Sequence, residues 1–253
     1  MRTCRLYVFL TVLLAAGLVA LIGCGGGGQV EDQPTTAEDL KTRMLAWVEE
    51  SHSKVEQPAE GPSSAPRFRH YGAGGLPVLL QTEMDQPFPG PILYDGSSHY
   101  YQSKVSRGGV EAGQWIEIPQ GLLESEDGRR RLGDLLDTLT WFWIFDPLTL
   151  LKASEPSGEL EPVKADSSWT YKGRVTAGKL AAFIPSGLAE DQLIHADDWE
   201  VEVTARADGA ITHFTLHAQL DTEFSYTLPW EEVDAAPVVP DDTVDIEEVL
   251  QAQ

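Results

Sequence analysis

Cysteine is nearly absent from this chain, which has only Cys4 and Cys24 among 253 residues. Because no cysteine follows position 24, the rest of the chain cannot form an internal disulfide, and its core must stabilise it unaided. Basic residues are also scarce, with 18 Lys and Arg against 40 Asp and Glu and a formal net charge of −22. This charge repels phosphates and anionic headgroups, which argues against a nucleic-acid partner and against electrostatic docking on a membrane.

The familiar catalytic and metal-binding motifs are missing as well. No Gly-x-Ser-x-Gly elbow presents a serine, and no Lys-Ser/Thr pair follows the glycine run, so we expect no enzyme. His213 and His217 have the spacing of a helical metal pair, but on the strand that we assign they would lie about 13 Å apart. The acidic runs at 231–232 and at 241–242 with Asp245 lack the spacing of a calcium loop. We therefore expect neither a metal nor another cofactor.

A basic cluster stands out in this acidic chain. Arg129-Arg130-Arg131 has a functional interpretation as a contact for a lipid headgroup or phosphate, since arginine suits phosphate oxygens. Its ordinary interpretation is a solvated turn whose charge is balanced by the nearby acids, and we favour this one. The acids are Glu124, Glu126, Asp127 and Asp134. We also interpret four histidines without ligand spacing as surface or hydrogen-bonded residues, namely His52, His70, His99 and His195.

A positive start followed by an apolar run marks the N-terminus. Arg2 and Arg5 precede the apolar residues 6–22, and Leu21-Ile22-Gly23-Cys24 stands where a signal peptide has its cleavage site. This junction resembles a bacterial lipobox, which implies that residues 1–23 are removed and that Cys24 carries a diacylglyceryl group. The other interpretation is an uncleaved transmembrane anchor, although a run of 17 apolar residues is at the short end of a membrane span.

Processing at Cys24 would define how the remaining chain is organised. Residues 24–36 begin with the lipidated cysteine and continue as a flexible tether rich in glycine and polar side chains. Residues 37–253 show no break in composition, so we predict one domain. Removal of residues 1–23 leaves 16 basic and 40 acidic residues, a net charge of −24, so acyl chains must provide the membrane attachment. We expect a lipid-anchored protein on the extracytoplasmic face of the cell membrane.

The pattern changes from helical to extended between residues 37 and 118. Thr36 and Asp39 resemble a capping box, and apolar side chains recur at helical spacing from Leu40 to Val48, which predicts a helix over 37–51. Short apolar runs over 67–118 predict a meander of antiparallel strands. Its clearest hairpin is at Asp95-Gly96, where both turn residues would need positive φ. Prolines within 76–91 predict an edge strand or a long loop there.

Helical spacing returns over 129–153, where an apolar face leads into the run Trp141–Phe145, and Asp146-Pro147 predicts the start of a short helix. The segments 199–207, 212–220 and 222–228 then alternate apolar and polar side chains, which is typical of strands. A sheet that alternates in this way has one face in water and one face covered, and the helices are the candidates to cover it. The pattern therefore predicts an α+β fold.

The order of these elements resembles the actinobacterial lipoproteins of the LppX and LprG type, which are relatives of the lipoprotein carrier LolA. The resemblance covers about residues 37–250 and is carried by the segments LYDGSSHYY, GQWIEI, DPLTLLKA, SSWTYKGRV and DDWEVEVTARADGAITHFTLHAQL. It implies a strongly curved antiparallel β half-barrel, with helices covering the concave face. It also implies an apolar cavity that takes the acyl chains of a lipid or glycolipid cargo, and an envelope transporter as a further partner. It supplies no catalytic residue.

Large apolar side chains near the end of the second helical region are our candidates for the wall of a lipid cavity. They are Leu136, Leu139, Trp141, Phe142, Trp143 and Phe145. Bulky apolar groups around an unfilled space suit acyl chains, but the same residues suit a packed core. Two functions therefore stay open. One is a lipid carrier, and the other is an envelope module with a packed core whose acidic face binds a partner protein.

Overall fold

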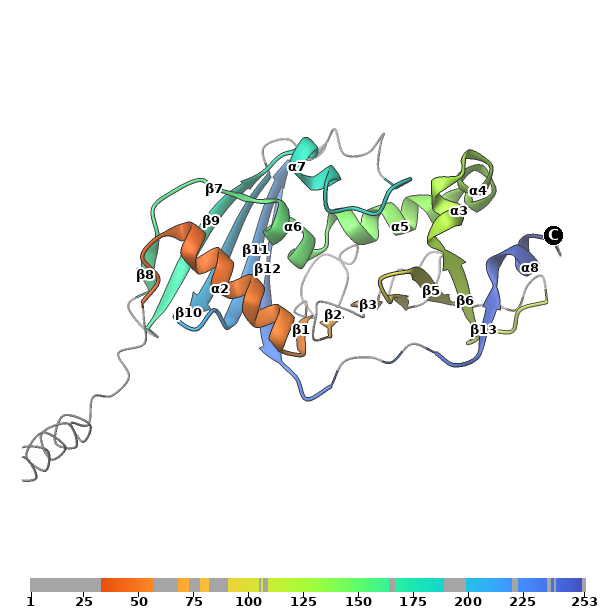
Figure 1. Cartoon of the computed structure of the whole chain (residues 1–253), viewed down its shortest axis with the longest axis horizontal. Helices are drawn as coiled ribbons and strands as arrows, with labels where there is room; N and C mark the ends of the chain where they lie inside the picture. The colour runs from red at the N-terminus through yellow and green to blue at the C-terminus, as the bar shows by residue number, and fades with distance from the viewer. Residues whose placement is uncertain are drawn as a thin grey trace, which may run out of the picture. The chain divides into compact units, whose positions relative to one another are not determined.

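One sheet runs through the folded unit, and its strand order does not follow the chain (Figure 1). The computed structural model describes residues 33–56, 68–72, 78–81, 91–104, 106, 109–163, 167–188, 199–219, 223–235, 238 and 240–251. The strands are β1 (Ser53–Glu56), β2 (Phe68–Tyr71), β3 (Val78–Gln81), β4 (Ile92–Tyr94), β5 (Ser98–Gln102), β6 (Trp115–Pro119), β7 (Glu155–Pro156), β8 (Glu161–Val163), β9 (Ser168–Val175), β10 (Trp199–Arg206), β11 (Ile211–Gln219), β12 (Glu223–Glu232) and β13 (Thr243–Asp245). They form a thirteen-stranded sheet in the order β13-β6-β5-β4-β3-β2-β1-β12-β11-β10-β9-β7, and β8 also pairs with β9.

The sheet consists of two local meanders that β12 joins. Strands β1 to β6 follow one another in space as in sequence, and β9 to β12 do the same, while β1 pairs with β12. The strand pairs are antiparallel, apart from the parallel pair of β13 with β6. The predicted α+β fold with an antiparallel sheet is therefore confirmed. The strong curvature and the half-barrel stay predictions.

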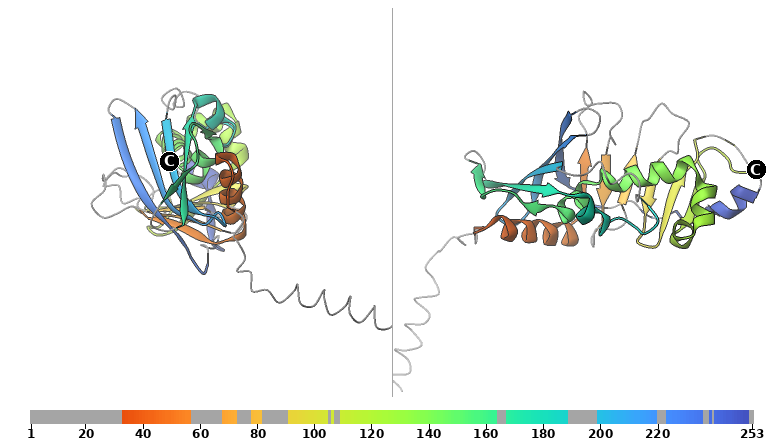
Figure 2. Two further views of the ribbon diagram at one scale, coloured as in Figure 1. Left: turned by 90° about the vertical axis from the view of Figure 1, so that its left-hand side faces the viewer. Right: turned by 90° about the horizontal axis from the view of Figure 1, so that it is seen from above.

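The helices that matter for the site lie on one side of this sheet (Figures 1 and 2). They are α2 (Ala37–Glu50), which contacts β9, and the pair α5 (Asp134–Ile144) and α6 (Pro147–Ala153). The remaining helices are α3 (Gln120–Glu124), α4 (Glu126–Leu132), α7 (Ala177–Ala181) and α8 (Ile246–Gln251). The side chains between α2, α5, α6 and the sheet form one continuous apolar core.

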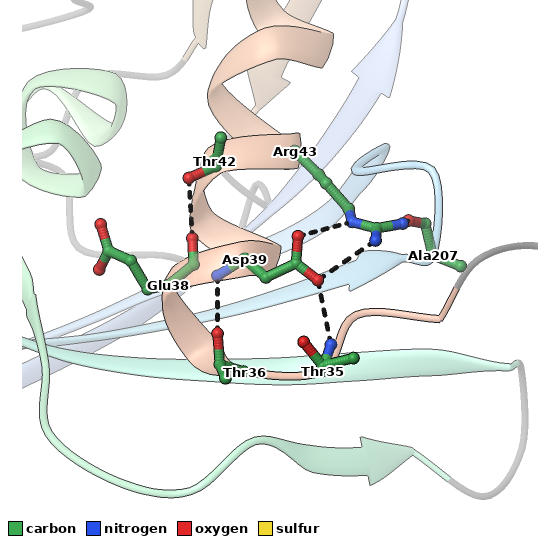
Figure 3. Close-up of polar contacts among 7 residues, drawn as sticks. All are labelled: Thr35, Thr36, Glu38, Asp39, Thr42, Arg43 and Ala207. Atoms are coloured by element: carbon green, nitrogen blue, oxygen red, sulfur yellow. Dashed lines mark hydrogen bonds and ion pairs between the residues drawn. The ribbon is translucent and has the colours of Figure 1, made fainter.

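Helix α2 begins as the sequence predicts and is fixed to the sheet by a polar network (Figure 3). The Thr36 hydroxyl accepts the Asp39 N–H at 3.1 Å, which satisfies one free donor of the first turn. The Asp39 carboxylate accepts the N–H of Thr35, one residue before the position that a capping box uses. Arg43 donates to Asp39 at 3.1 Å and to the Ala207 carbonyl at 3.1 Å. The network thus links the first turns of α2 to the end of β10.

The long strands bury one face, as their alternation predicts. On β10 the side chains of Trp199, Val201, Val203 and Ala205 are buried, and the intervening ones are exposed or half-buried. Gly209 turns the chain toward β11 with a φ of +92°, a conformation that favours glycine. A Cβ at this position would come within 2.3 Å of the Arg43 carbonyl oxygen, so only glycine lets α2 approach this turn closely.

The second helical region is divided into separate helices, which the sequence pattern did not predict. Gly133, with a φ of +52°, ends α4 and precedes α5. The start of α6 follows the prediction, because the Asp146 carboxylate accepts the Thr149 N–H at 2.7 Å and Pro147 occupies the first turn. This division gives α5 its own direction across β2 to β5 (Figure 1).

Two predictions about the meander were wrong. Residues 78–81 form β3, which pairs with β2 on one side and β4 on the other, so this segment is no edge strand. The prolines expected to prevent this lie outside the bounds of β3. At the β4–β5 turn only Gly96 has positive φ, because the Asp95 carboxylate holds the turn by accepting the N–H groups of Ser97 and Ser98 at 2.8 Å.

Candidate functional site

Cys24, the predicted lipid attachment site, lies outside the described residues together with most of the predicted tether, so its lipidation stays a prediction. Within the described ranges, no helix combines the length and the apolar character that crossing a bilayer requires.

The six residues predicted to form a cavity wall separate into two groups on and beside α5. Leu139, Phe142 and Trp143 are buried in the core between the helix and the sheet. Leu136 and Phe145 are half-buried and pack against this core, while Trp141 is 37% exposed. The helix therefore provides an inner set of side chains that face the sheet and an outer set that reaches solvent.

The outer set continues as a stack of aromatic rings from the surface to the core. The rings of Trp141 and Phe145 are one helical turn apart and stack with centroids 5.2 Å apart and planes 9° apart. Phe145 in turn stacks on Trp199, again at 5.2 Å and with planes 15° apart. Trp199 is fully buried at the start of β10. A column of stacked aromatic rings thus extends from exposed Trp141 to buried Trp199.

The inner set surrounds a histidine. His99 on β5 is directly opposite Tyr94 on β4, because the Asp95-Gly96 turn sets this register. Its ring centroid lies 4.7 Å from that of Tyr94, 5.9 Å from that of Trp143 and 6.4 Å from that of Phe142. The Trp143 indole N–H donates to His99 Nε2 at 2.8 Å. Three aromatic side chains therefore enclose a fully buried imidazole.

This contact determines which nitrogen of His99 carries the proton. Since Nε2 accepts a hydrogen bond, the neutral ring must carry its hydrogen on Nδ1. Nδ1 is buried, and throughout the described residues it has no hydrogen-bond partner. Burial lowers the pKa of His99 to about 3, against a weaker opposing effect of the Asp95 charge, so the ring stays neutral near pH 7. The site thus contains one buried N–H donor without an acceptor.

A second polar cluster lies between the start of α6 and β2. The Tyr71 hydroxyl donates to the buried Asp146 carboxylate at 2.9 Å, and the other Asp146 oxygen accepts the Thr149 N–H. Tyr71 also stacks on Trp230 with ring centroids 5.2 Å apart. Both oxygens of the Asp146 carboxylate therefore have hydrogen-bond donors, and the bond from Tyr71 links the α5–α6 junction to β2. His99, by contrast, has a buried N–H without an acceptor among the described residues.

The basic cluster has structural partners, as the ordinary interpretation expects. Arg129 donates to the Leu123 and Glu124 carbonyls, and Arg130 forms an ion pair with Asp127. Arg131 makes a bidentate pair with Glu247 of α8, at 3.0 and 2.7 Å. This last partner lies far along the chain and was not among the acids expected to balance the cluster. Its position shows that Arg131 attaches α8 to α4.

The paired histidines lie on a strand, as predicted. His213 and His217 are both exposed on β11, where they face Thr204 and Glu200 of β10. The His213 ring contacts the Thr212 hydroxyl at 3.2 Å. Within the part of the chain that the structure describes, no group of three or more His, Cys, Asp or Glu side chains is arranged to hold a metal ion.

Reasoning from the sequence missed His99, which we interpreted as a surface or ordinary hydrogen-bonded residue. A usable signal was its position just after an Asp-Gly turn, directly across the predicted hairpin from an aromatic residue. The Trp143 contact joins residues 44 positions apart, and no local pattern indicates it.

Comparison with known proteins gives little further information. No known protein family matches this sequence, and no curated protein sequence matches it. Among solved structures, the chain is similar to the Mycobacterium tuberculosis lipoprotein LppX. The match covers 80% of this chain and 96% of LppX, with 11% sequence identity and a TM-score of 0.39.

Proposed function

We propose that this protein is a membrane-anchored lipoprotein of the cell envelope that holds the acyl chains of a lipid or glycolipid between its sheet and α5. The observation that carries this proposal is the stack of Trp141, Phe145 and Trp199, which extends from solvent to the core. An acyl chain needs an apolar route of this kind, because each methylene left in water costs about 0.8 kcal/mol. Movement of these three side chains away from one another would let an acyl chain enter the apolar layer beneath α5.

The proposed anchor and the charge of the protein suit the same role. Acyl chains on Cys24, followed by a tether over 24–36, would keep the domain at the extracytoplasmic face of the membrane. The net charge of −24 after processing would repel anionic headgroups, so contact with lipid would depend on the apolar route. We propose a binding and carrier protein, not an enzyme, and an envelope transporter as the partner that supplies or accepts its cargo.

Native mass spectrometry of the processed full chain, purified from its host membrane, tests the proposal. A non-covalent adduct of lipid mass, near one per protein and removed by solvent extraction, is the expected result. The covalent lipid on Cys24 should remain after extraction, so the two can be distinguished. A chain that carries its anchor but no adduct, even after incubation with envelope lipids, would instead favour a partner-binding module with a packed core.

A matched pair of substitutions locates the cargo. Leu139→Trp adds bulk to a fully buried position of α5, whereas Asp137→Trp adds bulk to an exposed position of the same helix. We expect the first variant to lose the adduct and the second to keep it. If both folded variants keep the adduct at full occupancy, the cargo does not lie under α5.

A further inference from the structure

His99 Nδ1 and Trp230 Nε1 are both buried N–H donors without a hydrogen-bond partner among the described residues, unlike two other polar groups beneath the helices. Asp146 has a donor for each carboxylate oxygen, and the hydroxyls of Ser154 and Tyr171 bond to each other at 2.8 Å. His99 Nδ1 has no such acceptor among the described residues, although its ring is completely buried. Native interiors pair nearly all of their buried polar groups, so an unpaired one calls for an explanation.

The walls of the site restrict which acceptor could approach. Tyr94, Phe142 and Trp143 present aromatic rings, and His99 itself is neutral. A carboxylate or phosphate would lose its hydration here without gaining an opposite charge, which makes an anion a poor ligand. A neutral carbonyl oxygen accepts a hydrogen bond without this cost. Such a carbonyl joins each acyl chain of an ester-linked or amide-linked lipid to the rest of the molecule.

We propose that His99 Nδ1–H donates a hydrogen bond to the carbonyl oxygen of a bound acyl chain, and that this bond selects acyl lipids over alkyl-ether lipids. The inference builds on the proposed function, because it names the atom that recognises the cargo. The rings around His99 would contact the first methylenes of the chain, next to its carbonyl. Trp143 acts as a positioning residue, since its bond to Nε2 keeps the hydrogen on Nδ1.

Photocrosslinking of the full chain in lipid vesicles tests this inference without any substitution. The vesicles consist of di-O-hexadecyl phosphatidylcholine, which has no carbonyl. They contain a trace of a diazirine-bearing phosphatidylcholine with either two ester-linked or two ether-linked chains of equal length. The protein's own anchor is the same in both experiments. We expect about tenfold more crosslinking to α5 and the β4–β5 hairpin with the ester probe, because the ether leaves the buried donor unpaired.

Substitutions then assign the preference to one side chain. His99→Phe should remove the preference and leave both probes at the level of the ether probe. His99→Phe combined with Trp143→Phe also removes the indole donor that the first change leaves unpaired, and it should give the same result. Trp143→Phe alone should reduce the preference without abolishing it, because the hydrogen can then move to Nε2. A folded His99→Phe protein that still prefers the ester probe would refute the inference.

The remaining outcomes separate this inference from the proposed function. Equal crosslinking of both probes to α5 in the unsubstituted chain would refute the role of His99 and still support lipid binding. If neither probe crosslinks to the unsubstituted protein more than it does to the Leu139→Trp variant, the proposed function is refuted, and the inference with it.

Discussion

Helices α2 and α5 cover different halves of the same sheet, and the two halves differ in their strands and side chains. Under α2 the strands β9 to β12 are 8 to 10 residues long, and the helix buries small and aliphatic side chains such as Leu40, Met44 and Val48. Under α5 the strands β2 to β5 are 3 to 5 residues long, and the helix buries aromatic rings around an imidazole with an unpaired N–H. On the proposed function, the α2 half would stabilise the fold, and the α5 half, together with Trp199 of β10, would bind the lipid.

The largest expected effect tests whether the α2 half provides stability. Leu40→Ala removes a fully buried side chain of α2 and should lower the free energy of unfolding by about 2–5 kcal/mol, through lost burial and the cavity left behind. Urea unfolding measures this change. The control Glu49→Ala, on the exposed side of the same helix, should change the value by less than about 0.5 kcal/mol. Lipid occupancy per folded Leu40→Ala molecule should stay unchanged, and a loss of lipid there would contradict the division of roles.

A smaller effect is expected where α2 meets the β10–β11 turn. Gly209→Ala would force an alanine into a φ of +92° and place its Cβ 2.3 Å from the Arg43 carbonyl oxygen. We expect a loss of about 1–3 kcal/mol, measured by the same urea titration. Gly121→Ala is the control, because no atom lies within 4 Å of its Cβ and its φ is ordinary. Equal stability of the two variants would show that α2 does not approach this turn as closely as the structure indicates.

The smallest effect should appear in the α5 half, as a loss of stability in acid. The pKa of His99 is about 3 in the folded protein and near 6.5 in the unfolded chain, so between these values the unfolded state binds the extra proton. The contribution of His99 to stability is therefore complete above pH 6.5 and falls by about 1.4 kcal/mol for each pH unit below it. Urea titrations at pH 7.0, 6.5 and 6.0 measure this slope, and over this range the loss should stay below about 1 kcal/mol. The same titrations of His99→Phe give the pH dependence that other groups cause, and the difference between the two slopes is the contribution of His99. Identical slopes would mean that His99 is not buried.

Local chemistry made much of the fold predictable. The cap at Thr36, the start of α6 at Asp146-Pro147 and the alternation along β10 follow from neighbouring residues, and all three are confirmed. Three other features were not predicted. They are the pairing of β3 on both sides, the break between helices at Gly133, and the ion pair of Arg131 with Glu247. Each depends on what distant parts of the chain do, which local patterns cannot indicate.

The candidate site shows the same limit more clearly. The sequence pointed to α5 through its run of large apolar side chains, yet it did not separate buried Phe142 from exposed Trp141. It also gave no reason to single out His99, because the properties of that residue come from its distant contact with Trp143. Composition can therefore identify an aromatic segment, whereas the polar atom within it emerges only from the three-dimensional arrangement.

The position of β12 between β1 and β11 has a consequence for how the protein is made. The meander of β1 to β6 and the meander of β9 to β11 can each form from neighbouring segments, but they join only through residues 223–232. A ribosome completes this segment late, and a secretion channel that passes the N-terminus first would also release it late. The two meanders must therefore keep unpaired edges, at risk of aggregation, until residues 223–232 have emerged. Such long-range closure predicts slow folding.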